Sequence, residues 1–162
     1  MRLYLLIGLI VIIDQITKII IKESMYLGES IQLVGDFLRI TYVENPGIAF
    51  GIRVGHPIIF TILSLLASIV IIIYMIYHRN GEKILKYGLA VILGGALGNL
   101  IDRLLVQRVV DFVDVGIGDL RWPVFNVADS AVVIGMFMLI YAMIKIEKKE
   151  KASQFVKDKP SE

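Results

Sequence analysis

The stretch Pro57–Tyr77, PIIFTILSLLASIVIIIYMIY, decides the fold class because it runs for 21 residues without a charged side chain. A helix that crosses the hydrocarbon core of a bilayer needs roughly 20 mostly apolar residues, since its backbone must satisfy its own hydrogen bonds there. Soluble domains contain roughly 45–50% apolar residues, whereas this chain of 162 residues contains 57% and has a mean hydropathy of +0.76. The stretch therefore predicts a membrane-spanning helix.

Three further apolar blocks have a similar length and few charges. The predicted spans are residues 3–21, 57–77, 84–101 and 124–144. They predict an all-α membrane protein with four transmembrane helices, which form a single integral membrane domain over residues 1–162. A signal peptide is the alternative reading of the first block, but no small-residue cleavage site follows it.

The positions of Lys and Arg predict the orientation, because these residues gather on the cytoplasmic side of membrane proteins. The loop between the second and third spans carries Arg79 and Lys83, and residues 145–162 are rich in lysine. Both termini are therefore predicted to be cytoplasmic, in the cytoplasmic membrane of a bacterium, with residues 145–162 as a frayed, solvated tail. The connections 22–56 and 102–123 then lie at the outer face.

The first outer connection, residues 22–56, has strand character in part. Ile31–Val34 and Phe37–Val43 are separated by Gly35-Asp36, which is typical of a turn. This pattern predicts a small β-structured extracytoplasmic element between helices 1 and 2, lying at the membrane interface.

Charged groups inside or bordering spans are costly, so they are candidates for function. Asp102, Asp111, Asn126 and Asp129 fall at the outer ends of the third and fourth spans or in the link between them. Two carboxylates in a poorly solvated site cannot both ionise cheaply, so they hold one proton between them. Such a pair can activate a water and protonate the carbonyl oxygen or the leaving amine, as aspartyl peptide hydrolysis requires.

Other chemistries lack the residues that they need. The chain has no cysteine, which excludes disulfides, thiolate zinc sites and cysteine nucleophiles. His56 and His78 are far apart, so a histidine metal site or triad is not expected, and neither is a cofactor. A Ser–Lys dyad at Ser130 would need a lysine beside it, whereas Lys18 and Lys22 lie on another helix. The net charge of +2 is too small to indicate nucleic acid binding.

Structural roles remain open for the same residues. Asn126 with Asp129 three residues later is typical of a helix N-cap with an acidic first turn. Asp102 and Arg103 form a plain ion pair in the structural reading, and Asn99, on the same helix face, hydrogen-bonds to them.

Two other features have structural explanations. Asp14 lies one turn from Lys18 and pairs with it, and Gly94 and Gly98 have the small-xxx-small spacing that lets membrane helices approach closely. The sequence places Asp114 and Asp119 among solvated loop charges.

Five stretches carry a resemblance to a known family. They are Asp14–Lys18 (DQITK), Asn45–Phe50 (NPGIAF), Gly94–Arg103 (GGALGNLIDR), Val109–Phe112 (VVDF) and Phe125–Ser130 (FNVADS). In this order, on a chain with four predicted spans, they resemble the bacterial lipoprotein signal peptidases, also called signal peptidase II. One departure is Pro46, where the family often has Thr or another small residue.

The resemblance implies an aspartyl endopeptidase that cleaves prolipoproteins just before the diacylglyceryl-cysteine, at the outer face of the cytoplasmic membrane. It implies Asp111 and Asp129 as the catalytic pair. It also implies prolipoprotein substrates, membrane lipid and globomycin-type inhibitors as partners. The positions that it marks as supporting the site or contacting substrate are Asp14, Asn45, Gly47, Asn99, Asp102, Arg103, Asn126 and Ala128.

The division of labour between the two aspartates is a hypothesis. Asp129 lies in the first turn of a helix, whose dipole favours a carboxylate there, whereas Asp111 has the apolar neighbours that favour a held proton. Two other functions stay open. A proton-coupled transporter would use Asp14, Asp102 and Asp129 as a relay, and a structural subunit would use its polar residues only to bind helices together.

Overall fold

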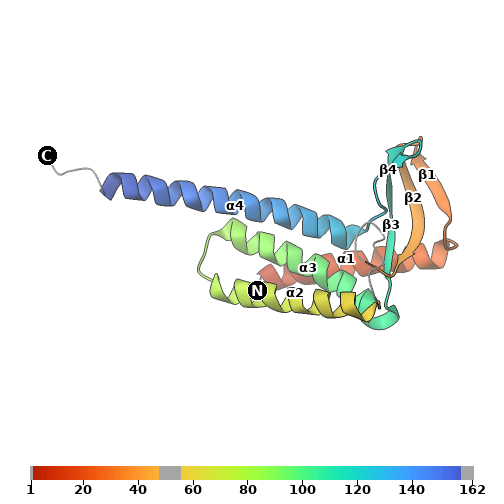
Figure 1. The fold of residues 1–162 in the computed structure, drawn as a ribbon, viewed down its shortest axis with the longest axis horizontal. Coiled ribbons are helices and arrows are strands. Elements are labelled where there is room, and N and C mark those ends of the chain that lie inside the picture. Colours follow the sequence, from red (N-terminus) through yellow and green to blue (C-terminus); the bar gives the residue numbers. More distant parts are fainter. Residues whose placement is uncertain (1, 48–55, 158–162) are drawn as a thin grey trace.

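Over the residues that the structure describes, the fold consists of four long helices and one small antiparallel sheet (Figure 1). The computed structural model describes residues 2–47 and 56–157, so the stretch Ile48–Gly51 of the resemblance lies outside the described residues. The helices are α1 (Arg2–Ser24), α2 (Ile58–Tyr77), α3 (Lys83–Val106) and α4 (Val127–Lys157). All four are long and apolar enough to cross a membrane, which confirms the prediction of four apolar helices.

Two helices run further than the sequence predicted. α3 was predicted to end at residue 101 but continues to Val106, so Asp102 and Arg103 lie inside the helix. The prediction of a frayed tail from residue 145 was wrong, because α4 continues to Lys157. Lys151 pairs with Glu147 one turn earlier at 2.6 Å, and such i,i+4 pairs support a helix beyond its apolar part.

α3 is the central helix, since it packs against each of the other three. Its glycines allow this close contact, as the small-residue spacing predicted. A Cβ on Gly94 would lie 2.9 Å from the Cβ of Ile10 in α1, and a Cβ on Gly98 would lie 2.6 Å from Oδ2 of Asp14. α1 and α2 leave most of their Ile, Leu and Val side chains exposed, which suits helices that face lipid.

The sheet differs from the prediction in its origin. Its strands are β1 (Ser30–Val34), β2 (Leu38–Asn45), β3 (Val109–Ile117) and β4 (Leu120–Arg121), in the order β1-β2-β3-β4. The two strands predicted between helices 1 and 2, with their turn at Gly35, are confirmed as β1 and β2. The prediction that the β-structured element is confined to that connection was wrong. β3 and β4 come from the connection between α3 and α4, and β2 pairs antiparallel with β3.

Asp114 is also misplaced by the sequence reading, which put it in a solvated loop. It is buried on β3, where Oδ1 accepts a hydrogen bond from Nε of Arg121 at 2.7 Å and Oδ2 accepts one from the Thr41 hydroxyl at 2.7 Å. Asp114 thus links β3 to β4 through the ion pair and to β2 through the hydrogen bond from Thr41. Asp119, in the turn between β3 and β4, is exposed as predicted.

The sheet lies at one end of the helix bundle (Figure 1). α1 begins and α4 ends at the other end, where Glu82 pairs with Lys145 and Lys149. The connections that carry β1 to β4 therefore gather beside the polar residues of α3 and α4, and this end of the bundle contains the candidate site.

Candidate active site

Asp111 is a carboxyl group of β3 that faces into the protein. Its Oδ1 accepts a hydrogen bond from Nδ2 of Asn126 at 2.6 Å, and its Oδ2 accepts one from Nδ2 of Asn45 at 3.1 Å. Burial raises the pKa of Asp111 to about 7, and the nearby charge of Asp129 acts in the same direction against these two hydrogen bonds. Asp111 therefore titrates near neutral pH.

Asp129 lies in the first turn of α4, and its hydrogen bonds explain why that helix begins there. The Asp129 amide donates to Oδ1 of Asn126 at 2.9 Å, while the Asn126 amide donates to Oδ2 of Asp129 at 3.2 Å. This reciprocal arrangement is a capping box. The N-cap reading is thus confirmed. The other oxygen of Asp129, Oδ1, accepts from Nδ2 of Asn99 in α3 at 2.8 Å.

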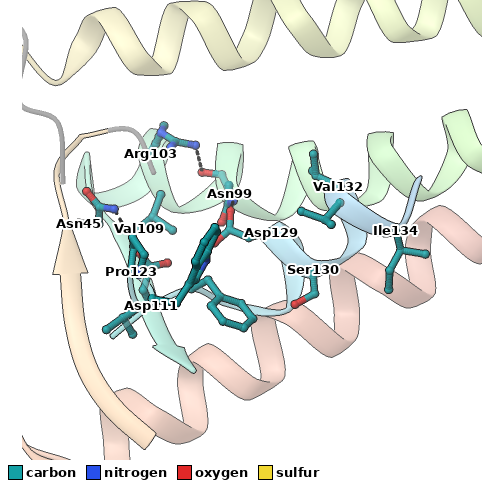
Figure 2. A pocket seen from close by; sticks show the side chains of 14 residues that line it. Asn45, Asn99, Arg103, Val109, Asp111, Pro123, Asp129, Ser130, Val132 and Ile134 are labelled. Carbon is teal, nitrogen blue, oxygen red and sulfur yellow. Dashed lines mark hydrogen bonds between the residues drawn. The ribbon is translucent and has the colours of Figure 1, made fainter. Parts of the chain in front are cut away.

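Both aspartates line one cavity of about 590 Å³ between the sheet and the turns of α3 and α4 nearest to it (Figure 2). Its polar wall consists of Asn45, Asn99, Arg103, Asp111, Asp129 and Ser130. Apolar side chains line the remainder, including Val109, Phe125 and Val132. Val133 and Ile134 of α4 line the cavity and are also about half exposed, so its apolar wall continues onto the outer surface of the bundle.

Arg103, on the polar wall of this cavity, is linked to Gly47. The Arg103 guanidinium donates to the carbonyl oxygens of Asn99 and Gly47, each at 3.4 Å. The Gly47 amide donates to Oδ1 of Asn45 at 2.9 Å, which holds that side chain with its Nδ2 toward Asp111. The sequence reading selected all three residues, and the structure brings them together beside the two aspartates.

A buried charged cluster lies behind the cavity. Lys18 of α1 contacts Asp14 at 2.8 Å, as predicted, but it also contacts Asp102 of α3 at 2.9 Å. The predicted pairing of Asp102 with Arg103 was wrong, because adjacent residues on a helix do not face each other. Lys18 was not among the candidate site residues, although a single lysine inside an apolar span is the signal that identifies such a group.

Ala128 contributes its backbone to the same cluster. The side chain is fully buried, and the amide donates to Oδ1 of Asp14 at 2.9 Å. Gln15, which the sequence reading passed over, donates from Nε2 to Oδ2 of Asp14 at 3.2 Å and to Oδ1 of Asp102 at 3.1 Å. The polar wall of the cavity is therefore supported by the hydrogen bonds that Asp14 and Gln15 of α1 make.

The geometry also bears on the competing chemistries. The hydroxyl of Ser130 donates to the carbonyl of Asn126, while Lys18 is engaged by Asp14 and Asp102, so the two do not form a dyad. His56 precedes α2 and His78 follows it, at opposite ends of the helix. Within residues 2–47 and 56–157, no group of three or more His, Asp or Glu side chains is placed to hold a metal ion.

The fold and the site define a multi-pass membrane protein in which one buried and one partly buried carboxyl group line the same cavity. A family model for signal peptidase (SPase) II matches residues 6–145. The lipoprotein signal peptidase of Syntrophus aciditrophicus is 40% identical over 148 residues, covering 88% of this chain and 92% of the relative. That of Halothermothrix orenii is 39% identical over 145 residues, covering 90% and 97%.

Solved structures agree with this match. One bacterial membrane enzyme, determined by the in meso method, has a TM-score of 0.79 and 34% identity, covering 99% of this chain and 94% of its own. A second has a TM-score of 0.73 and 35% identity, covering 89% and 93%. The chain therefore belongs to the signal peptidase II family, the lipoprotein signal peptidases, which process the signal peptides of prolipoproteins.

Proposed function

We propose that the protein is an aspartic endopeptidase whose catalytic pair is Asp111 and Asp129. It cleaves lipid-modified prolipoproteins on the N-terminal side of the diacylglyceryl-cysteine. The observation that carries this proposal is the placement of two carboxyl groups, from β3 and α4, at the wall of one cavity. Each of their four oxygens accepts a hydrogen bond from an N–H group, so both carboxyl groups are held in fixed orientations.

The proposed reaction assigns the base to Asp129 and the acid to Asp111. Asp129 lies in the first turn of α4, where the helix dipole favours a carboxylate. The pKa of Asp111 is raised to about 7 by burial and by the charge of Asp129. Asp111 therefore holds a proton near neutral pH, while Asp129 accepts one from water. Because the two groups titrate as a coupled pair, this assignment names the reactive microstate.

The proposed steps balance without a further reactant. The oxygen of a water bonds to the scissile carbonyl carbon, one water proton passes to Asp129, and the Asp111 proton passes to the carbonyl oxygen. The C–N bond of the resulting diol then breaks. The proton on Asp129 passes to the leaving amine, and a diol proton returns to Asp111. The products are a carboxylic acid and an amine, and both aspartates regain their starting states.

The apolar part of the cavity supports a substrate that carries lipid. Val132, Val133 and Ile134 extend the wall from Asp129 along α4, and the last two reach the exposed, lipid-facing surface. A peptide anchored by a diacylglyceryl group can thus reach the aspartates from the membrane with its acyl chains still in an apolar environment. The polar wall also contains Asn45 and Arg103, whose side-chain amide and guanidinium groups can bind the peptide backbone.

Charge distribution supports an outer-face site in the bacterial cytoplasmic membrane. Arg79 and Lys83 of the α2–α3 turn, together with the lysines of the end of α4, lie at the end of the bundle away from the sheet. Since such residues mark the cytoplasmic side, the sheet and the aspartates face outward, and both termini are cytoplasmic. Cleavage there releases the product on the side to which prolipoproteins are exported.

Cleavage of a defined substrate tests this proposal. The purified protein in detergent micelles is incubated with a prolipoprotein carrying the diacylglyceryl group and with the same chain lacking it. We expect a shortened product from the lipid-modified chain only, and its loss with Asp111→Asn, with Asp129→Asn or with a globomycin-type inhibitor. Asp119→Asn removes an exposed carboxyl group at the same end and is expected to cleave like wild type. Appreciable turnover by either dyad variant would remove that residue from the mechanism, and an inactive wild type would refute the proposal.

A further inference from the structure

A single buried ammonium group lies behind the two aspartates. Lys18 is only 2% exposed, and its Nζ lies 2.8 Å from Oδ2 of Asp14, 2.9 Å from Oδ2 of Asp102 and 2.8 Å from Oδ1 of Asn99. A lysine ammonium can donate three hydrogen bonds and can accept none. The three contacts therefore use all three protons, and they tie α1 to two positions of α3.

Two of these contacts continue to the backbone beside the aspartates. Asp14 accepts the amide of Ala128 at 2.9 Å, and Asp102 accepts the amide of Val110 at 3.3 Å. Ala128 directly precedes Asp129 in α4, and Val110 directly precedes Asp111 in β3. One ammonium thus holds, through one carboxylate each, the backbone on the N-terminal side of both aspartates.

The third contact of Lys18 sets the direction of a chain of amides. Because the ammonium can only donate, the atom of Asn99 that faces it must be Oδ1, and Nδ2 is turned toward Asp129. Oδ1 of Asn99 also accepts from Nδ2 of Asn126 at 3.1 Å, and the same Nδ2 donates to Asp111 at 2.6 Å. The side chains of both aspartates are thereby oriented from Lys18 as well.

We infer that Lys18 is the positioning residue that sets the separation and orientation of the Asp111 and Asp129 carboxyl groups. It touches neither of them and acts through Asp14, Asp102 and Asn99. The inference rests on the proposed function, because a pair of groups that share one water must keep their spacing. A misplacement of about 1 Å in such a site costs about a hundredfold in rate, so the loss of Lys18 reduces turnover rather than substrate binding.

The test uses Lys18→Met and the double variant Lys18→Met/Asp14→Asn. The single variant leaves two buried carboxylates without their cation, which itself destabilises a protein. The double variant removes one positive and one negative charge, so the net charge of the cluster is unchanged while the ammonium is lost. We expect kcat for the lipid-modified prolipoprotein to fall about a hundredfold in both, with KM within about threefold of wild type. Lys22→Met, on the exposed face one turn further along α1, is the matched control and is expected to cleave like wild type.

A distance measurement keeps this test separate from the proposed activity. The chain has no native cysteine, so spin labels can be placed at Leu120→Cys in β4 and Phe137→Cys in α4, both of which are exposed. We expect one narrow label–label distance in the wild-type background and a broader distribution in the double variant. If the wild type is inactive but the double variant still shows the broader distance distribution, the proposed function is refuted and the positioning role of Lys18 is not. A folded double variant with wild-type kcat, or with its loss confined to KM, would overturn the role of Lys18. Failure of both Lys18 variants to fold would do so too, since Lys18 would then stabilise the fold rather than the pair.

Discussion

Replacement of Gly98 by alanine tests how tightly the site is packed against α1. The added Cβ would lie 2.6 Å from Oδ2 of Asp14, 3.1 Å from its Cγ and 3.3 Å from the Cβ of Ala128. Asp14 cannot turn away without loss, because it accepts hydrogen bonds from Lys18, Gln15 and the Ala128 amide. Either α1 must move away from α3 or the cluster behind the aspartates must break.

The magnitude follows from the cost of overpacking. An extra methyl group in a tightly packed interior costs about 1–3 kcal/mol. For a protein of about 150–250 residues, each kcal/mol shifts the unfolding midpoint by about 2–4 °C, so we expect Tm in detergent to fall by about 2–12 °C. Because the displaced group holds the backbone next to Asp129, the cleavage rate is expected to fall by about a hundredfold, more than the change in stability alone would produce.

The assays are thermal unfolding in detergent and cleavage of the lipid-modified prolipoprotein. Gly8→Ala is the matched control, since Gly8 is also a helical glycine but a Cβ there would meet nothing within 4 Å. We expect that variant to keep wild-type cleavage and an equal or slightly higher Tm. A Gly98→Ala protein that matches Gly8→Ala in both measurements would refute the reasoning, because it would show that the contact between α3 and Asp14 is loose.

Three other predictions concern charge, capping and the sheet. The cleavage rate is expected to fall by about tenfold for each pH unit above 7 in a pH series, because Asp111 acts protonated and its pKa is raised to about 7; a rate still rising at pH 8 would contradict its role as the acid. Asn126→Ala removes the N-cap of α4, worth about 0.5–2 kcal/mol, and a hydrogen-bond donor to Asp111. We expect a lower Tm in the unfolding assay and a lower rate in the cleavage assay, whereas Asn80→Ala in the exposed α2–α3 turn is expected to change neither. Asp114→Asn breaks the buried pair with Arg121 and is expected to lower stability by about 3 kcal/mol, measured as faster proteolysis of the sheet. The control is Asp119→Asn, at an exposed position, and its proteolysis is expected to match wild type.

The helices were predictable because a bilayer leaves a chain few choices. A block such as Pro57–Tyr77 must satisfy its backbone internally and therefore forms a helix. The polar residues at the outer ends of the spans were predictable for the same reason, since each needs a partner or a function. The family's motifs then selected Asp111 and Asp129 from among them, and the structure brings both to one cavity.

The contacts between distant segments were not predictable from local pattern. β3 pairs with β2, whose residues lie more than sixty positions earlier, as with Asp111 and Val43. A strand in the short link Asp102–Pro123 is supported by that partner rather than by its own sequence. The same limit hid the pairing of Lys18 with Asp102, because the local pattern showed only Asp14, one turn away on the same helix.

The pairing of β2 with β3 has a consequence for how the protein is made. Asn45, Asp111 and Asn126 come from the first connection, the last connection and the start of the fourth helix, yet they form one hydrogen-bonded set. Until the start of α4 has been synthesised, Asp111 on β3 can pair with β2 but lacks its partner Asn126. Pairing between strands so far apart in the sequence is slow compared with the formation of local helical contacts. We therefore expect the proposed catalytic pair to be complete only once the fourth helix is in place, and a nascent chain to be inactive until then.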